Sequence, residues 1–186
     1  MKVVFCHHAE RERGRSFNSQ NDSITSLGKK DAEIVSKLIK KLDSQNKIKA
    51  VFSSPYLRCM ETAKIVTKGL SGISIETDER LNEFKSKVVE TWVEFQYRIN
   101  DFLIEKENEF EKDDVIVCFT SGLNIVGFIN WSYGLSASEN APYLGVPSCS
   151  PIMFTKNKTR PSLVLFGAGD GDRTRDLRLG KATLYH

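Results

Sequence analysis

A pair of histidines, His7 and His8, directly follows the short apolar run Val3 to Cys6 near the start of the chain. Such a run predicts a buried strand, and in open α/β sheets ligands bind beyond the carboxyl ends of the strands. His8 is therefore expected at a ligand-binding edge, where a neutral imidazole can act as a nucleophile. A single histidine at such a place is more often structural or at the surface, so the interpretation depends on the residues around it.

Arg58 is the second residue whose type and position could do chemistry, because it follows a helix-start signal. Ser54 can cap the free amides of a helix, and Pro55 suits the first helical position. Arg58 would then lie in the first turn, beside a helix N-terminus that already favours anions, and its fork of donors suits phosphate. A surface arginine in a salt bridge is the alternative.

The elements that must position these residues begin with short apolar runs. They lie at Val3 to Cys6, Ala50 to Phe52, Val115 to Phe119 and Leu163 to Phe166, with a weaker run at Ile73 to Ile75. Each run is continuous rather than alternating, which is typical of strands covered on both faces in a parallel sheet. We therefore expect a sheet with helices on its faces.

Four segments between these runs have the spacing of amphipathic helices. The first would open after the N-cap Thr25, the second would run from Pro55 to about Thr67, and the third would run from Trp92 towards Phe110. The fourth would begin near Gly122 and end near Gly134. Strands that alternate with helices predict the α/β class.

The composition restricts the function further. The 186 residues suit one globular domain, and 27 basic against 24 acidic residues leave a net charge of only +3, so we expect no nucleic-acid partner. Four scattered cysteines without a Cys-x-x-Cys pair predict neither a metal site nor a disulfide framework. No apolar run is long enough to span a membrane and no secretory signal is visible, so we expect a cytoplasmic protein without a membrane partner.

The composition changes after Gly167. The last twenty residues, GAGDGDRTRDLRLGKATLYH, have almost no apolar periodicity. They look like the peptide produced when an open reading frame runs through a transfer-RNA gene. We therefore predict a domain over residues 1–167 and a non-native or disordered tail over residues 168–186. A basic arm for nucleic acid is the alternative, but the acidic residues of this segment nearly cancel its basic ones.

Five segments resemble the motifs of the histidine phosphatase superfamily, which contains phosphoglycerate mutases and many small phosphatases. The most specific is SSPYLRCMETA at 53–63, which follows the pattern Ser-Pro-x-x-Arg-x-x-x-Thr-Ala. The others are VVFCHHAER at 3–11, ITSLGKKDA at 24–32, DERLNEF at 78–84 and VIVCFTSGLNI at 115–125. The resemblance implies a phosphoglycerate mutase-like, three-layer α/β sandwich with a mostly parallel central sheet flanked by helices.

The resemblance also implies a phosphomonoester hydrolase that needs no cofactor or metal. His8 would become a phosphohistidine that water then hydrolyses, while Arg58 binds the phosphate. Glu83 would be the general acid, although neighbouring Glu79 keeps that assignment open. The partner would be a phosphorylated small molecule or a phosphoprotein, and the sequence does not choose between them.

Two further residues could contact the phosphate. Some members of the family carry an arginine at the position of Arg11, although a solvated basic loop is the alternative for Arg11 and its neighbours. Backbone amides near Gly122, at the start of the fourth helix, could hold one phosphate oxygen.

Two positions depart from the pattern of the family. His7 stands where the family has its first phosphate-binding arginine, and Ser121 stands where it has its second histidine. Both remain candidate phosphate ligands, but a histidine is only partly protonated at neutral pH and a serine is uncharged. Two missing charged hydrogen bonds, each of about 1.5 to 3 kcal/mol, could remove roughly two to four powers of ten in rate. The alternative function is therefore a catalytically impaired pseudophosphatase that serves as an anion-binding or protein-interaction module.

Overall fold

A single sheet of six strands forms the centre of the computed structural model, within the described residues 1–12, 20–45, 47–85, 89–132, 145–157 and 160–165. The strands are β1 (Lys2–His7), β2 (Ile48–Ser53), β3 (Ile75–Thr77), β4 (Val115–Thr120), β5 (Pro151–Asn157) and β6 (Arg160–Leu165). Their order is β3-β2-β4-β1-β5-β6. The first four in this order are parallel, whereas β5 pairs antiparallel with β1 and with β6. The predicted, mostly parallel sheet is confirmed.

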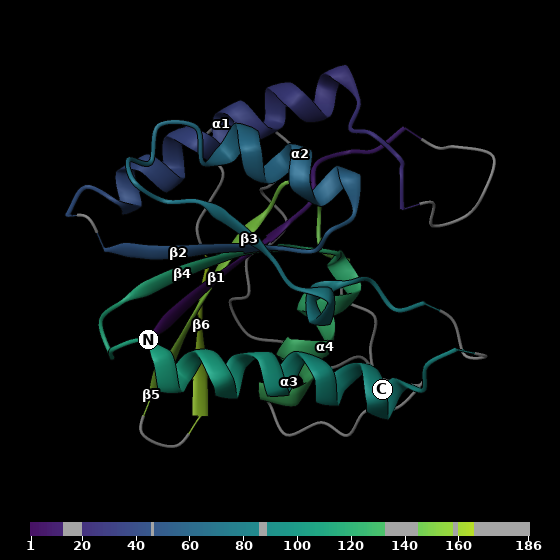
Figure 1. Cartoon of the computed structure of the whole chain (residues 1–186), viewed down its shortest axis with the longest axis vertical. Helices are drawn as coiled ribbons and strands as arrows, with labels where there is room; N and C mark the ends of the chain where they lie inside the picture. Colours follow the sequence, from purple (N-terminus) through teal and green to yellow (C-terminus); the bar gives the residue numbers. More distant parts are fainter. Residues whose placement is uncertain (13–19, 46, 86–88, 133–144, 158–159, 166–186) are drawn as a thin grey trace.

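Helices cover both faces of this sheet (Figure 1). One face carries α1 (Ser26–Leu42) and α2 (Leu57–Val66), and the other carries α3 (Trp92–Glu109) and α4 (Gly122–Ser132). Successive residues of a strand point to opposite faces, so Val4 and Cys6 pack in the core under α1 and α2, while Val3 and Phe5 pack in the core under α3 and α4. These two cores make the three-layer α/β sandwich that the sequence predicts.

Local sequence signals explain where three of the helices begin. The Thr25 side chain accepts a hydrogen bond from the Gly28 amide at 2.9 Å, which confirms it as the N-cap of α1. Helix α3 begins at Trp92, as the spacing predicts, behind a capping box made by Thr91 and Glu94. Helix α4 begins at Gly122, also as predicted.

The predicted start of the second helix is wrong by two residues. Helix α2 begins at Leu57 with Tyr56 as N-cap, and no side chain caps it. The hydroxyl of Ser54 instead donates to the side-chain oxygen of Asn82 at 2.6 Å. The same hydroxyl accepts from the amide of Tyr56 at 3.3 Å, so Ser54 and Pro55 lie just before the helix.

Two elements have no counterpart in the sequence prediction. One is β5, whose segment PIMFTKN mixes apolar and polar residues, and the other is η1, a 3-10 helix at Glu79–Leu81. Strand β3 begins at Ile75 rather than Ile73. Gly134, Phe166 and the predicted tail over 168–186 lie outside the described residues.

The four cysteines are all free and buried. None of the helices in the described segments combines the length and the apolar composition that crossing a membrane requires.

Candidate active site

His8 lies where the carboxyl ends of β1 and β4 meet, since these two strands are adjacent and parallel. Its amide donates to the carbonyl oxygen of Thr120 at 3.0 Å, and its carbonyl oxygen accepts from the amide of Cys149 at 3.1 Å. The residue is buried, with 7% of its surface exposed. The expected position of His8 just beyond a strand end is therefore found.

The imidazole of His8 has a defined tautomer. Its Nδ1 lies 2.8 Å from the carbonyl oxygen of Ala9, and because a carbonyl can only accept, Nδ1 must carry the proton. Burial, followed by the neighbouring His7, lowers the pKa of His8 to about 2, and the charges of Arg58 and Arg11 act in the same direction. The ring is therefore neutral near pH 7, with the lone pair on Nε2.

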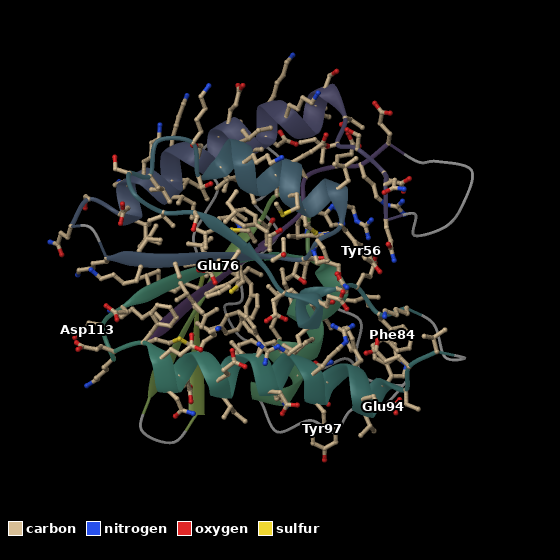
Figure 2. All side chains as sticks on the ribbon, viewed as in Figure 1. Tyr56, Glu76, Phe84, Glu94, Tyr97 and Asp113 are labelled. Carbon is tan, nitrogen blue, oxygen red and sulfur yellow. The ribbon has the colours of Figure 1, made fainter. Side chains whose placement is uncertain are left out.

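Arg58 has a fully buried side chain at the start of α2. Its Nη2 donates to the Oε2 of Glu83 at 2.6 Å, and its guanidinium carbon lies 4.8 Å from the centre of the Tyr56 ring. Figure 2 shows Tyr56 and Phe84, the residue after Glu83, towards one end of the sheet, whereas Asp113, before β4, lies towards the other. Because Arg58 lowers the pKa of both His7 and His8, its charge is within electrostatic reach of both rings.

Thr62 connects the arginine to the histidine. Its hydroxyl donates to the carbonyl oxygen of Arg58 at 2.6 Å and accepts from the amide of Ala9 at 2.9 Å. The residue is fully buried on α2. The helix that carries Arg58 is thereby fixed to the loop that begins with His8.

Of the two carboxyl candidates, Glu83 is the one that contacts Arg58. It follows η1 and its side chain is mostly buried, whereas Glu79, in η1, is exposed. Phe84 anchors the segment on the far side, because its ring stacks on that of Trp92 at 4.4 Å between centres. His8, Arg58 and Glu83, which are far apart in the sequence, are thus brought to one region.

His7 lies beside His8, with the two ring centres 4.5 Å apart. Its Nδ1 lies 2.9 Å from the carbonyl oxygen of Val146 and 3.1 Å from that of Pro147, so this nitrogen donates to the backbone. Burial lowers the pKa of His7, against the effect of these two hydrogen bonds, and the charge of Arg58 lowers it further. The ring is therefore uncharged at neutral pH, and its Nε2 carries no proton to donate to a phosphate.

Ser121 and Gly122 lie beside these histidines at the end of β4. The hydroxyl of Ser121 donates to the Oδ1 of Asn124 at 2.8 Å, so its proton is engaged within the protein. A Cβ on Gly122 would lie 3.1 Å from the His7 ring, which means that the glycine leaves room for this imidazole. Sequence reasoning missed Asn124, although side chains three residues apart at a helix start commonly contact each other.

Arg11 lies close enough for its charge to lower the pKa of His8. Its Nη1 donates to the carboxylate of Asp22, which is buried, while its backbone forms a β-bridge with Ile24. Nothing in the sequence spacing singles out Asp22. The two arginines of the site, Arg11 and Arg58, are therefore both paired with carboxylates.

The described residues contain no group of three or more His, Cys, Asp or Glu side chains that could hold a metal ion.

Comparison with known proteins agrees with this fold and motif set. Residues 3–91 match the family described as the histidine phosphatase superfamily (branch 1). YhfR of Bacillus stearothermophilus superposes with a TM-score of 0.72 at 17% identity, over 88% of this chain and 95% of that one. A mycobacterial glucosyl-3-phosphoglycerate phosphatase superposes with a TM-score of 0.69 at 15% identity, over 89% of this chain and 97% of that one. Phosphoglycerate mutase from Bacillus anthracis superposes with a TM-score of 0.67 at 16% identity, over 89% of this chain and 92% of that one.

No curated protein sequence matches the chain. The solved structures show that its fold is that of the phosphoglycerate mutase-like α/β proteins. The segment that matches the histidine phosphatase superfamily, residues 3–91, carries His8, Arg58 and Glu83. This match supports a phosphatase-type function.

Proposed function

We propose that the protein is a phosphomonoester hydrolase that acts through a phosphohistidine at His8. One observation carries this proposal: the hydrogen bond from Nδ1 to the Ala9 carbonyl leaves a neutral ring with its lone pair on Nε2, within electrostatic reach of Arg58. The substrate would be a phosphorylated small molecule or a phosphoprotein in the cytoplasm. The reaction needs neither a metal nor a cofactor.

The first step would transfer the phosphoryl group to His8. Nε2 attacks phosphorus, an N–P bond forms, and the P–O bond to the leaving group breaks. Arg58 turns its donors from Glu83 to the phosphate oxygens. The released carboxylate takes the proton of the monoanionic phosphate ester and gives it to the departing oxygen. The Ala9 carbonyl stabilises the positive charge that develops on the ring, because it accepts a hydrogen bond from Nδ1.

The second step would be hydrolysis of the phosphohistidine. Glu83, now a carboxylate, takes a proton from water as the water oxygen attacks phosphorus and the N–P bond breaks. Glu83 passes this proton to the inorganic phosphate, which leaves, and the carboxylate pairs with Arg58 again. The same carboxyl group thus acts first as the acid and then as the base.

A pseudophosphatase that binds anions without hydrolysis is the second candidate, and specific contacts favour it. The donor nitrogen of His7 and the hydroxyl of Ser121 are both engaged within the protein, where the family has charged phosphate ligands. Arg58 is fully buried against a carboxylate. Phosphate would then raise the melting temperature through Arg58 while no ester is hydrolysed.

Turnover of p-nitrophenyl phosphate by the wild type and by His8→Asn separates the two functions. Asparagine keeps a donor for the Ala9 carbonyl but has no nitrogen at the Nε2 position. We expect activity in the wild type, none above background in His8→Asn, and an acid-labile phosphorylated species only in the wild type. His186→Asn, in the predicted tail, is the matched control. Equal rates for the wild type and His8→Asn would refute the hydrolase.

A further inference from the structure

A cluster of buried polar side chains surrounds the segment Leu81–Glu83. Its members come from three parts of the chain, and each is at most 5% exposed: Ser54, Asn82, Thr120, Ser121 and Asn124. Buried polar groups are stable when they are hydrogen-bonded, so the partners of this cluster show what it fixes.

Asn124, on the first turn of α4, makes the central contacts of the cluster. Its Nδ2 donates to the carbonyl oxygens of Leu81 at 3.1 Å and Asn82 at 3.0 Å. Its Oδ1 accepts from the hydroxyl of Ser121 at 2.8 Å. The orientation of this amide is fixed, because exchanging its oxygen and nitrogen would place an acceptor against two carbonyl oxygens.

Further donors hold the same segment. The hydroxyl of Thr120 donates to the carbonyl oxygen of Leu81 at 2.6 Å, and the Ser54 hydroxyl donates to the Asn82 side chain. From α3, Nη2 of Arg98 lies 3.4 Å from the carbonyl oxygen of Glu83. The backbone that carries the Glu83 carboxyl group is therefore held by side chains from α3, from α4 and from the end of β4.

We propose that Asn124 is a positioning residue that acts through Glu83. With Ser121 as the group that orients its amide, it fixes the carbonyls of Leu81 and Asn82 and thereby sets where the Glu83 carboxyl group lies relative to Arg58. This inference rests on the proposed hydrolase, in which Glu83 protonates the leaving oxygen. Ser121 then serves the acid of the reaction instead of the phosphate.

The dependence on the leaving group distinguishes positioning from a merely structural effect. An acid accelerates the loss of a basic leaving oxygen far more than the loss of a weakly basic one. We expect Asn124→Ala to lower kcat for phenyl phosphate about tenfold more than for p-nitrophenyl phosphate, with KM little changed. Ser121→Ala should show the same pattern more weakly, and Asn130→Ala, a buried amide further along α4, should leave the ratio of the two rates as in the wild type.

A double-mutant cycle with Glu83→Gln completes the test. If Asn124 acts through Glu83, Asn124→Ala added to Glu83→Gln lowers the remaining rate less than about twofold. Equal losses for the two esters, or the same loss with and without Glu83, would overturn the inference.

An inactive wild type would instead refute the proposed function, and a crystal structure of Asn124→Ala would then decide the positioning. Displacement of the Glu83 carboxyl group from Arg58 would support the inference. An unchanged contact between the two would contradict it.

Discussion

Replacing Glu83 with glutamine tests the ion pair at the centre of the site. The substitution keeps the size of the side chain and one acceptor oxygen, but removes the negative charge that faces Arg58 at 2.6 Å. A buried guanidinium is thereby left without its carboxylate. We expect the variant to be less stable than the wild type and to bind inorganic phosphate more tightly.

The structure gives the size of the loss. Removing one partner of a buried pair costs about 3 to 5 kcal/mol. The Arg58 side chain is fully buried but that of Glu83 is 17% exposed, so the lower end of this range, about 3 kcal/mol, applies. For a domain of this length each kcal/mol corresponds to roughly 2 to 4 °C, which predicts a melting temperature lower by about 6 to 12 °C.

Phosphate should reverse much of this loss. In the wild type an anion must displace the carboxylate from Arg58, whereas in Glu83→Gln the ion pair with residue 83 no longer competes with the anion. A ligand present at 100 times its Kd adds about 2.7 kcal/mol of stability. We therefore expect a steeper rise of melting temperature with phosphate concentration in the variant than in the wild type.

The assay is urea unfolding and thermal melting over a phosphate series, with chloride at matched ionic strength as the control. The double variant Arg58→Met with Glu83→Gln should be more stable than Glu83→Gln alone and should not respond to phosphate. A Glu83→Gln protein as stable as the wild type would show that the ion pair contributes nothing. A phosphate response that survives loss of Arg58 would show that the anion binds elsewhere.

Three other perturbations have defined outcomes. The folded pKa of His8, about 2, lies below its ordinary value, so below about pH 6.5 the unfolded chain binds a proton at His8 that the folded chain does not. The contribution of His8 to the free energy of unfolding therefore falls by at most about 1.4 kcal/mol for each pH unit below 6.5. His8→Asn should lose stability less steeply than the wild type between pH 6.5 and 5, and an equal pH dependence of the two melting temperatures would contradict this. The Cβ of Gly122→Ala would lie 3.1 Å from the His7 ring, so the variant should lower the free energy of unfolding in urea by about 1 kcal/mol or more. In a His7→Ala background the same substitution should lower it much less. An equal loss in both backgrounds would contradict the steric explanation. Deleting residues 168–186 should leave the melting temperature and the rate with p-nitrophenyl phosphate unchanged, and a loss of either would show that the tail takes part.

The sequence predicts most of the fold because its signals are local. Continuous apolar runs locate β1, β2 and β4, and Thr25 marks the start of α1 through a contact three residues away. Strand β5 escapes prediction because its pattern is mixed and its pairing with β1 joins distant parts of the chain. The hydrogen bond from Ser54 to Asn82 escapes prediction for the same reason, since the two residues are 28 positions apart.

In the candidate site, too, the sequence predicts the residues within local motifs but not the contacts between distant parts of the chain. Motif spacing predicts His8, Arg58 and Glu83, and the structure brings them to one region. It does not predict the carbonyls of Val146 and Pro147, which engage the donor nitrogen of His7, because they lie some 140 residues away and belong to the backbone. Burial, which lowers the pKa of both histidines, is likewise a property of the packed chain.

The enclosure of Arg58 has a kinetic consequence. The guanidinium of Arg58 has no exposed surface, because it lies against the Tyr56 ring and is held by Glu83. An anion in solution therefore cannot contact it directly. An opening event must come first, so the observed association rate should level off at high anion concentration instead of rising in proportion to it. The rate of anion binding would then be limited by this opening motion of the protein. Added salt would lower that rate less than it lowers the rate of binding to an exposed arginine.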